Sequence, residues 1–263
     1  MSKRITQAFA ECKAQNQAAF VAYIMGGDPD LKTSQALMNA LPSAGVDIIE
    51  LGMPFTDPAA DGPTIEEAGL RSLAAGTTLT DILTMASDFR KTNDATPIII
   101  MGYCNPVHHM GYAEFAKRAK SAGIDGAIIV DLPPEEDHEL RAAFDHHDLA
   151  LIRLATPTTD AERLPRVVAG TKGFVYYVSM TGITGAALSQ ALDIKNQVAA
   201  VKAASGLPVV VGFGVKTPKR AAEVAKDADG VVVGSAIVKA LHEDGIDKAL
   251  SLVRDLARAA HSA

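Results

Sequence analysis

Residues 50–64 read ELGMPFTDPAADGPT and carry three carboxylates, Glu50, Asp57 and Asp61. The preceding run 46–51 is mainly apolar and predicts a buried strand, so Glu50 comes near the end of that strand. A charge in such a place is costly unless it is solvated, paired or used for chemistry. Two carboxylates in different environments can have their pKa values pushed apart, which gives one proton donor and one anion. This stretch therefore predicts acid–base catalysis by Glu50 and Asp61.

Glycine-rich segments follow three other apolar runs. Gly212-Phe213-Gly214 follows the run 208–211, and Gly234-Ser235 follows the run 230–233 and opens a helical pattern. Backbone N–H groups at such a loop and at a helix start can hold a phosphate dianion, and glycine lets the backbone approach it. The third segment, 181–186, is small and could act as a lid that excludes water.

The elements that must position these residues are predicted from eight short apolar runs. The runs do not alternate strictly, as expected for parallel strands covered on both faces. They are Phe20–Met25, Val46–Leu51, Pro97–Met101, Gly126–Val130, Leu149–Leu154, Gly173–Val178, Pro208–Val211 and Gly230–Val233. Segments at helical spacing lie between them: Ala113–Ala122, Pro134–His146, Ile194–Ala204, Pro218–Lys226 and Ile246–Ala260.

Eight strand–helix units without an interrupting linker predict an α/β fold, a (β/α)₈ TIM barrel over residues 1–263 as a single domain. The alternative is a doubly wound open sheet, but no Gly-x-Gly-x-x-Gly follows the first strand. Residues 2–17 predict an extra N-terminal helix that closes the lower end of the barrel. Since active sites of this fold lie at the carboxyl ends of the strands, Glu50, Asp61 and the glycine loops are all expected on that one face.

Size and charge exclude several other classes. The chain has 263 residues, and 25 Lys and Arg against 31 Asp and Glu give a net charge of −6, with no basic stripe for nucleic acid. Neither a signal peptide nor a membrane span is expected. The two cysteines, Cys12 and Cys104, fit a reducing cytoplasm better than a disulfide framework.

Metal binding is not expected. The adjacent pairs His108-His109 and His146-His147 do not have the spacing of a zinc site. Lys239 follows the glycine loops but lies within a helical pattern, whereas a Schiff-base lysine is expected at a strand end. Tyr103 and Tyr176 lie near strand ends, where a phenol could line a pocket or simply cover the barrel.

With these residues in view, the chain resembles the alpha subunit of tryptophan synthase along nearly its whole length. The long pattern 50–64 is the most specific part of the resemblance. Further matching stretches are 27–29, 101–106, 131–133, 182–185, 212–214 and 234–239. The resemblance implies a lyase of tryptophan biosynthesis, which cleaves indole-3-glycerol phosphate to indole and glyceraldehyde 3-phosphate by a retro-aldol step.

The resemblance also implies roles for individual residues. It makes Glu50 and Asp61 the catalytic pair. The implied substrate-binding residues are Tyr176, Thr184, Gly185, Phe213, Gly214, Gly234 and Ser235, and Asp57, Pro58 and Pro133 are implied to face a beta subunit. The implied assembly is an alpha2beta2 heterotetramer in the cytoplasm, with no metal or cofactor in this chain and pyridoxal phosphate in the beta subunit. Met180 departs from the arginine that some members carry in the lid.

Three other functions remain open from the sequence. A free-standing indole-3-glycerol phosphate lyase would have the same chemistry and no partner. A phosphosugar isomerase or synthase would keep the phosphate site and place its catalytic groups on other strands. A barrel that only binds a partner would not need Glu50 and Asp61.

Overall fold

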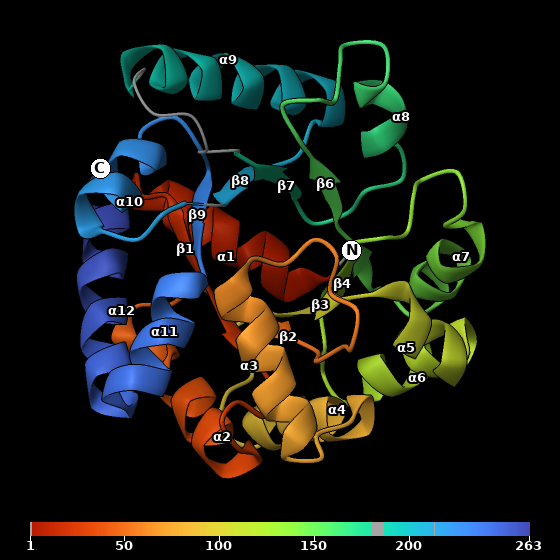
Figure 1. Ribbon diagram of the computed structural model, residues 1–263. Coiled ribbons are helices and arrows are strands. Elements are labelled where there is room, and N and C mark those ends of the chain that lie inside the picture. The colour runs from red at the N-terminus through yellow and green to blue at the C-terminus, as the bar shows by residue number, and fades with distance from the viewer. Residues whose placement is uncertain (1, 180–186, 213) are drawn as a thin grey trace.

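The computed structural model describes residues 2–179, 187–212 and 214–263. Parallel strands form a ring, and helices surround it on the outside (Figure 1). The strand order is β5-β4-β3-β2-β1-β9-β8-β7-β6. Strands that follow one another in the chain are paired, except β5 and β6 at the two ends of this order, and β1 also pairs with β9. This order closes the two ends of the chain onto each other, which is the topology of a TIM barrel and excludes the doubly wound sheet.

The described strands are β1 (Ala19–Met25), β2 (Ile48–Gly52), β3 (Ile98–Gly102), β4 (Gly126–Ile129), β5 (Ala150–Leu151), β6 (Arg153–Ala155), β7 (Val175–Val178), β8 (Val209–Gly212) and β9 (Gly230–Val233). The described helices begin with α1 (Lys3–Ala14), α2 (Leu31–Ala40), the short 3₁₀ helix η1 (Pro42–Ala44), α3 (Pro63–Ala74), α4 (Leu79–Arg90), α5 (Cys104–Met110) and α6 (Tyr112–Ser121). The second half has α7 (His138–His146), α8 (Leu164–Val168), α9 (Ala187–Ser205), α10 (Pro218–Ala225), α11 (Ser235–Asp244) and α12 (Ile246–His261).

All eight predicted strands are present, and one of them is divided. The predicted strand 149–154 forms β5, which pairs with β4, and β6, which pairs with β7, on either side of Ile152. The same short segment therefore meets both neighbours and closes the ring. The predicted helix 134–146 begins only at His138, because residues 134–136 form a turn instead.

Two apolar clusters hold the barrel together. One lies inside the ring and contains alternate strand residues such as Val21, Ile48 and Val210. The other lies between the strands and the helices and contains the residues next to these, such as Ile49 and Val211. Because both faces of each strand are buried, the strands are apolar throughout, which explains why the sequence showed runs without strict alternation.

Helix α1 closes the amino-terminal end of the barrel, as predicted. Ile5 and Phe9 of α1 belong to the interior cluster, and the ring of Phe9 lies 5.7 Å from that of Phe174. In Figure 1 α1 lies behind the ring of strands, so the opposite end of the barrel faces the viewer.

The connection from β2 to α3 is the long loop that the sequence predicted. It starts after Gly52 and ends at Gly62, and Pro63 starts α3 at the position where proline is favoured. Residues after α3 form a second helix, α4, whose start carries a capping box between Thr78 and Asp81. The extra length between β2 and β3 is therefore one loop and two helices.

No helix in the described ranges is both long enough and apolar enough to cross a bilayer.

Candidate active site

Glu50 points into the barrel from β2. Parallel pairing places it opposite Tyr23 of β1 and Ile99 of β3, and the alternate strand residues at these positions face the interior. Two residues later β2 ends at Gly52. The carboxyl group therefore lies near the carboxyl end of the barrel, as the sequence predicted.

Both carboxyl oxygens of Glu50 are buried and have no hydrogen-bond partner among the described residues. The residue is only 1% exposed. Burial, together with the nearby charge of Asp61, raises the pKa of Glu50 from 4.5 to about 8. At neutral pH this carboxyl group is therefore mainly protonated and can donate a proton.

Asp61 lies in the loop between β2 and α3 and is half-buried. Partial burial raises the pKa of Asp61 from 3.8 to about 6, although a hydrogen bond with Tyr103 opposes this rise. At neutral pH the side chain is mainly ionised. The two carboxyl groups thus differ in protonation between about pH 6 and pH 8, with a proton on Glu50 and a negative charge on Asp61.

Tyr103 fixes the part of the loop that carries Asp61. Its hydroxyl oxygen accepts a hydrogen bond from the Ala60 N–H at 3.1 Å and also interacts with Asp61. Its ring stacks on Phe55 with centroids 5.2 Å apart. Two points of the loop are therefore attached to the start of α5, where Tyr103 is the N-terminal flanking residue.

Two other tyrosines enter the pocket, Tyr23 from β1 and Tyr176 from β7, and glycines leave room for them. A Cβ atom at Gly52 would lie 2.2 Å from the Tyr23 hydroxyl, and one at Gly212 would lie 2.0 Å from the Tyr176 hydroxyl. Tyr176 was predicted from the resemblance. Tyr23 is a pocket residue that the sequence patterns did not predict; the available signal was a single phenol near the end of an otherwise aliphatic strand.

The predicted phosphate site lies at the ends of β8 and β9. Gly234 precedes α11, and no side chain caps the first turn of this helix, which begins at the exposed Ser235. Gly214 has a φ of +79°, a conformation that favours glycine. The structure therefore brings two loops and an uncapped helix start to the face where Glu50 and Asp61 lie.

The remaining predicted residues divide into two groups. Asp57 and Pro133 are exposed and Pro58 is half-buried, in the loops that follow β2 and β4. Met180, Thr184, Gly185 and Phe213 lie outside the described residues.

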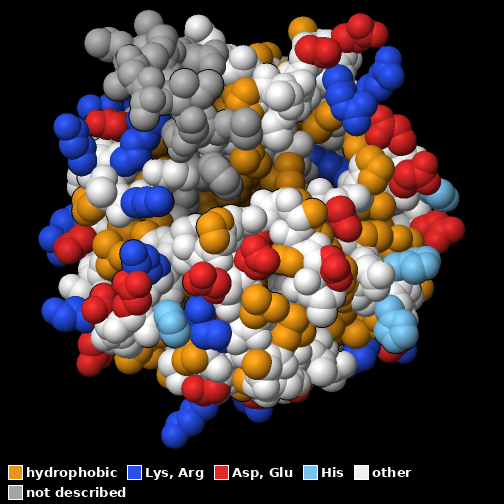
Figure 2. Space-filling view, viewed as in Figure 1, with side chains coloured by type: hydrophobic (Ala, Val, Ile, Leu, Met, Phe, Trp, Pro, Cys, Tyr) orange, Lys and Arg blue, Asp and Glu red, His pale blue; other side chains and the backbone are white. Residues whose placement is uncertain are grey.

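Figure 2 shows this face of the molecule, with a hollow whose walls include hydrophobic side chains. Within the part of the chain that the structure describes, no group of three or more His, Cys, Asp or Glu side chains could hold a metal ion. The polar groups that described residues bring to the pocket include the two carboxyl groups and the phenols of Tyr23, Tyr103 and Tyr176. Such a set can transfer protons and hold a polar ligand.

Comparison with known proteins identifies the family. The sequence model of the family described as tryptophan synthase alpha chain matches residues 9–262. A tryptophan synthase subunit alpha from Legionella pneumophila str. Paris has 39% identity and a TM-score of 0.92, with 100% of each chain covered. A tryptophan synthase alpha chain from Legionella pneumophila subsp. pneumophila has 39% identity and a TM-score of 0.89, with 98% of this chain and 97% of that chain covered.

A Mycobacterium tuberculosis tryptophan synthase structure gives the same result, with 39% identity, a TM-score of 0.91 and 99% of each chain covered. Identity at this level over whole chains extends well beyond a shared barrel fold. The chain therefore belongs to the tryptophan synthase alpha chain family, and it is a lyase of tryptophan biosynthesis.

Proposed function

We propose that Glu50 and Asp61 carry out the family's reaction, the retro-aldol cleavage of indole-3-glycerol phosphate to indole and glyceraldehyde 3-phosphate. The observation that carries this assignment is the difference between the two carboxyl groups. Glu50 is buried without a described partner and has a pKa of about 8, whereas Asp61 has a pKa of about 6. One group is therefore an acid and the other an anion at the same pH.

Glu50 starts the reaction by donating its proton to carbon 3 of the indole ring. That carbon becomes tetrahedral, and positive charge develops on the indole nitrogen. Asp61, which is ionised, accepts a hydrogen bond from the indole N–H and stabilises this charge. Removal of the charge from Asp61 would therefore slow the step even if substrate still bound.

Glu50 then completes the reaction as a base. Its carboxylate takes the proton from the glycerol hydroxyl on the carbon attached to indole, and that carbon becomes the aldehyde. The electrons of the broken C–C bond return to the ring, which neutralises the indole nitrogen. Glu50 is protonated again at the end, so one residue acts as acid and then as base.

The phosphate is proposed to bind at Gly214, Gly234 and Ser235. Support comes from the uncapped start of α11 and the positive φ of Gly214, both at the carboxyl ends of the strands. Phe213, Thr184 and Gly185 are proposed ligands from the resemblance alone. A phosphate held there would orient the reacting carbon between Glu50 and Asp61 through binding energy remote from the chemistry.

The proposed partner is a tryptophan synthase beta subunit, in an alpha2beta2 assembly located in the cytoplasm. Asp57, Pro58 and Pro133 are the proposed contact residues; the first and last are exposed in the loops after β2 and β4, next to the active site. No cofactor is proposed for this chain, and pyridoxal phosphate is expected in the beta subunit. Membership of the alpha chain family favours this subunit role over a free-standing lyase.

The test is an assay of indole-3-glycerol phosphate cleavage with and without a cognate beta subunit. We expect the beta subunit to raise substrate affinity about 5–150-fold, the range of a coupling free energy of ~1–3 kcal/mol, and to raise cleavage as well. The rate should follow a bell-shaped pH profile with limbs near pH 6 for Asp61 and pH 8 for Glu50. Asp61→Asn should cut turnover severely while phosphate-ligand binding persists; full activity in this variant would remove Asp61 from the mechanism.

A further inference from the structure

Tyr23 lies in the active-site pocket, and the mechanism proposed above gives its hydroxyl no role. Its backbone is fixed in β1 by pairing with β2 and β9. The Cβ atom of Tyr23 packs against Gly234: a Cβ atom added to that glycine would lie only 3.1 Å away. At its other end, the Tyr23 hydroxyl lies in the space next to Gly52. The phenol therefore extends from the proposed phosphate end of the site toward the carboxyl groups.

The Tyr23 hydroxyl forms no hydrogen bond with a described residue, and it is not one of the fully buried polar atoms, so it is open to the pocket. Tyr23 as a whole is 7% exposed, and the O–H of a largely buried tyrosine usually finds a partner. Glu50, directly opposite in the sheet, also has no described partner for its carboxyl oxygens. Unpartnered polar groups that share a pocket indicate that their hydrogen bonds form during binding or catalysis.

The position of the hydroxyl indicates which carboxyl group it serves. The hydroxyl lies at Gly52, where β2 ends and the loop that carries Asp61 begins. In agreement with this position, burial raises the pKa of Tyr23, and the charge of Asp61 is the next cause, followed by that of Glu50. For Tyr176, which enters the pocket from β7, the charge that acts is that of Glu50. Since a raised pKa keeps the Tyr23 proton in place throughout the working pH range, the phenol is a permanent hydrogen-bond donor.

We propose that Tyr23 is a positioning residue that donates a hydrogen bond to the Asp61 carboxylate when substrate is bound, and so holds this carboxylate ionised and directed at the indole N–H. The inference rests on the proposed function of Asp61. Asp61 is in a loop, where Tyr103 already contacts it, whereas Tyr23 is fixed in the sheet. Donors from two elements restrain a carboxylate better than one, and each favours its charged form.

The test compares Tyr23→Phe, which keeps the ring and removes only the hydroxyl, with the parent chain in the presence of the beta subunit. We expect kcat for indole-3-glycerol phosphate cleavage to fall roughly tenfold and KM to stay within about twofold. The acidic limb of the kcat profile should move upward by roughly one pH unit, because the ionised form of Asp61 loses a donor. A purely structural role for the ring would leave this limb in place.

Tyr176→Phe is the matched control. It removes a phenol of similar burial that is coupled to Glu50, so it should leave the acidic limb unchanged even if it alters the rate. In an Asp61→Asn background, Tyr23→Phe should change the residual rate by less than about twofold, because the residue through which it acts is no longer charged. A further tenfold loss in that background would overturn the proposal in favour of direct contact with substrate.

A second measurement does not depend on turnover. The Asp61 carboxyl signal, followed by carbon-13 NMR in the substrate-analogue complex and assigned with Asp61→Asn, should titrate at a higher pH in Tyr23→Phe than in the parent chain. An unchanged titration together with unchanged kcat would overturn the proposal. If the parent chain failed to cleave indole-3-glycerol phosphate, the proposed function would fail, while this titration would still decide whether Tyr23 acts on Asp61.

Discussion

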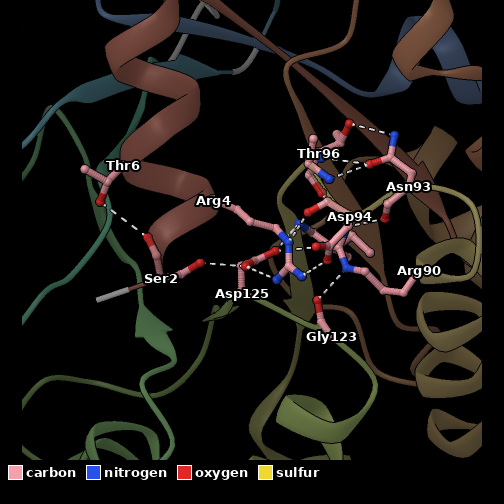
Figure 3. Close-up of polar contacts among 11 residues, drawn as sticks. Ser2, Arg4, Thr6, Arg90, Asn93, Asp94, Thr96, Gly123 and Asp125 are labelled. Atoms are coloured by element: carbon pink, nitrogen blue, oxygen red, sulfur yellow. Dashed lines mark hydrogen bonds and ion pairs between the residues drawn. The ribbon is translucent and has the colours of Figure 1, made fainter.

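Glu50 and Asp125 are buried carboxylates at opposite ends of the barrel, and their surroundings are opposite too. Glu50 faces the interior near the carboxyl end of β2 and has no described partner. Asp125 directly precedes β4 and accepts hydrogen bonds from Ser2 at 2.5 Å, Arg4 at 3.2 Å, Arg90 at 2.8 Å and the Ile98 N–H at 2.9 Å. Figure 3 shows the side chains of Ser2, Arg4 and Arg90 converging on this carboxylate.

The two sites show how the fold separates stability from chemistry. Asp125 bonds to groups at α1, α4 and β3. Its charge is therefore compensated, and it connects these three elements at the amino-terminal end of the barrel. Glu50 is desolvated without compensation, which favours its protonated form and costs stability whenever it ionises. An uncompensated buried carboxyl group is a common mark of a functional site, and a fully bonded one is a mark of structure.

The largest expected effect comes from Glu50→Gln. The amide cannot transfer the proton, so we expect cleavage to fall roughly 10²–10⁴-fold, while the free energy of unfolding at pH 7 stays the same or rises. Steady-state assays and urea unfolding on the same preparation measure both quantities. Glu114→Gln, an exposed change on α6, is the control and should alter neither. Activity of Glu50→Gln within about a factor of two of the parent would remove Glu50 from the mechanism.

Asp125→Asn should have the opposite effect to Glu50→Gln, with lower stability and unchanged catalysis. Loss of the charge leaves Arg90, whose side chain is only 10% exposed, without its main counter-charge. We expect about 3–5 kcal/mol of lost stability, the usual cost of breaking a buried ion pair, with kcat of the folded protein unchanged. Asp94→Asn is the matched control: Asp94 pairs with the same Arg4 but is 88% exposed, so it should lose little stability. Equal losses in the two variants would contradict the importance of burial.

How far the sequence predicts these features depends on how local their causes are. The strands were predictable because parallel strands buried on both faces are apolar throughout, and Glu50 was predictable because a charge in such a run is unusual. The division of the strand 149–154 at Ile152 was not, because it reflects pairing with both β4 and β7. The late start of α7, after the turn at residues 134–136, coincides with a buried ion pair between Asp137 and Arg153 of β6, and no local pattern encodes that contact.

The pocket too has features that depend on distant residues and could not be predicted from the sequence. Tyr23 was not predictable as a site residue, because its place depends on the glycines of β2 and of the loop after β9, which leave the space for its ring. The Glu50 and Asp61 pair could be proposed, but the order of their pKa values required burial and the contact with Tyr103. Chemistry carried by residue type is visible in a sequence, whereas chemistry tuned by surroundings is not.

The pH dependence of stability should separate Glu50 from its surroundings. Its pKa is about 8 in the folded chain against 4.5 as the ordinary value, so the folded state binds this proton more tightly. The contribution to stability is complete below about pH 4.5 and is lost as pH rises through about 8, with a total on the order of a few kcal/mol. Urea unfolding of the parent and of Glu50→Gln from pH 5 to pH 9 should show the parent losing stability relative to the variant. Parallel curves would mean that Glu50 is ionised at neutral pH.

The smallest expected effect comes from the loss of one hydrogen bond at the amino-terminal end of the barrel. Ser2→Ala removes the hydroxyl that donates to Asp125 at 2.5 Å, but the arginines and the Ile98 N–H still satisfy that carboxylate. We therefore expect a loss of about 1 kcal/mol, the net worth of one hydrogen bond, and no change in cleavage. Ser43→Ala is the control, because Ser43 is exposed and its hydroxyl bonds only to the nearby Ala40 carbonyl.

In an Asp125→Asn background, the loss of stability caused by Ser2→Ala should be smaller, because the Ser2 hydroxyl then donates to a neutral amide. A Ser2→Ala loss as large as that of Asp125→Asn would show that the hydroxyl, and not the pair of arginines, holds α1 to the barrel.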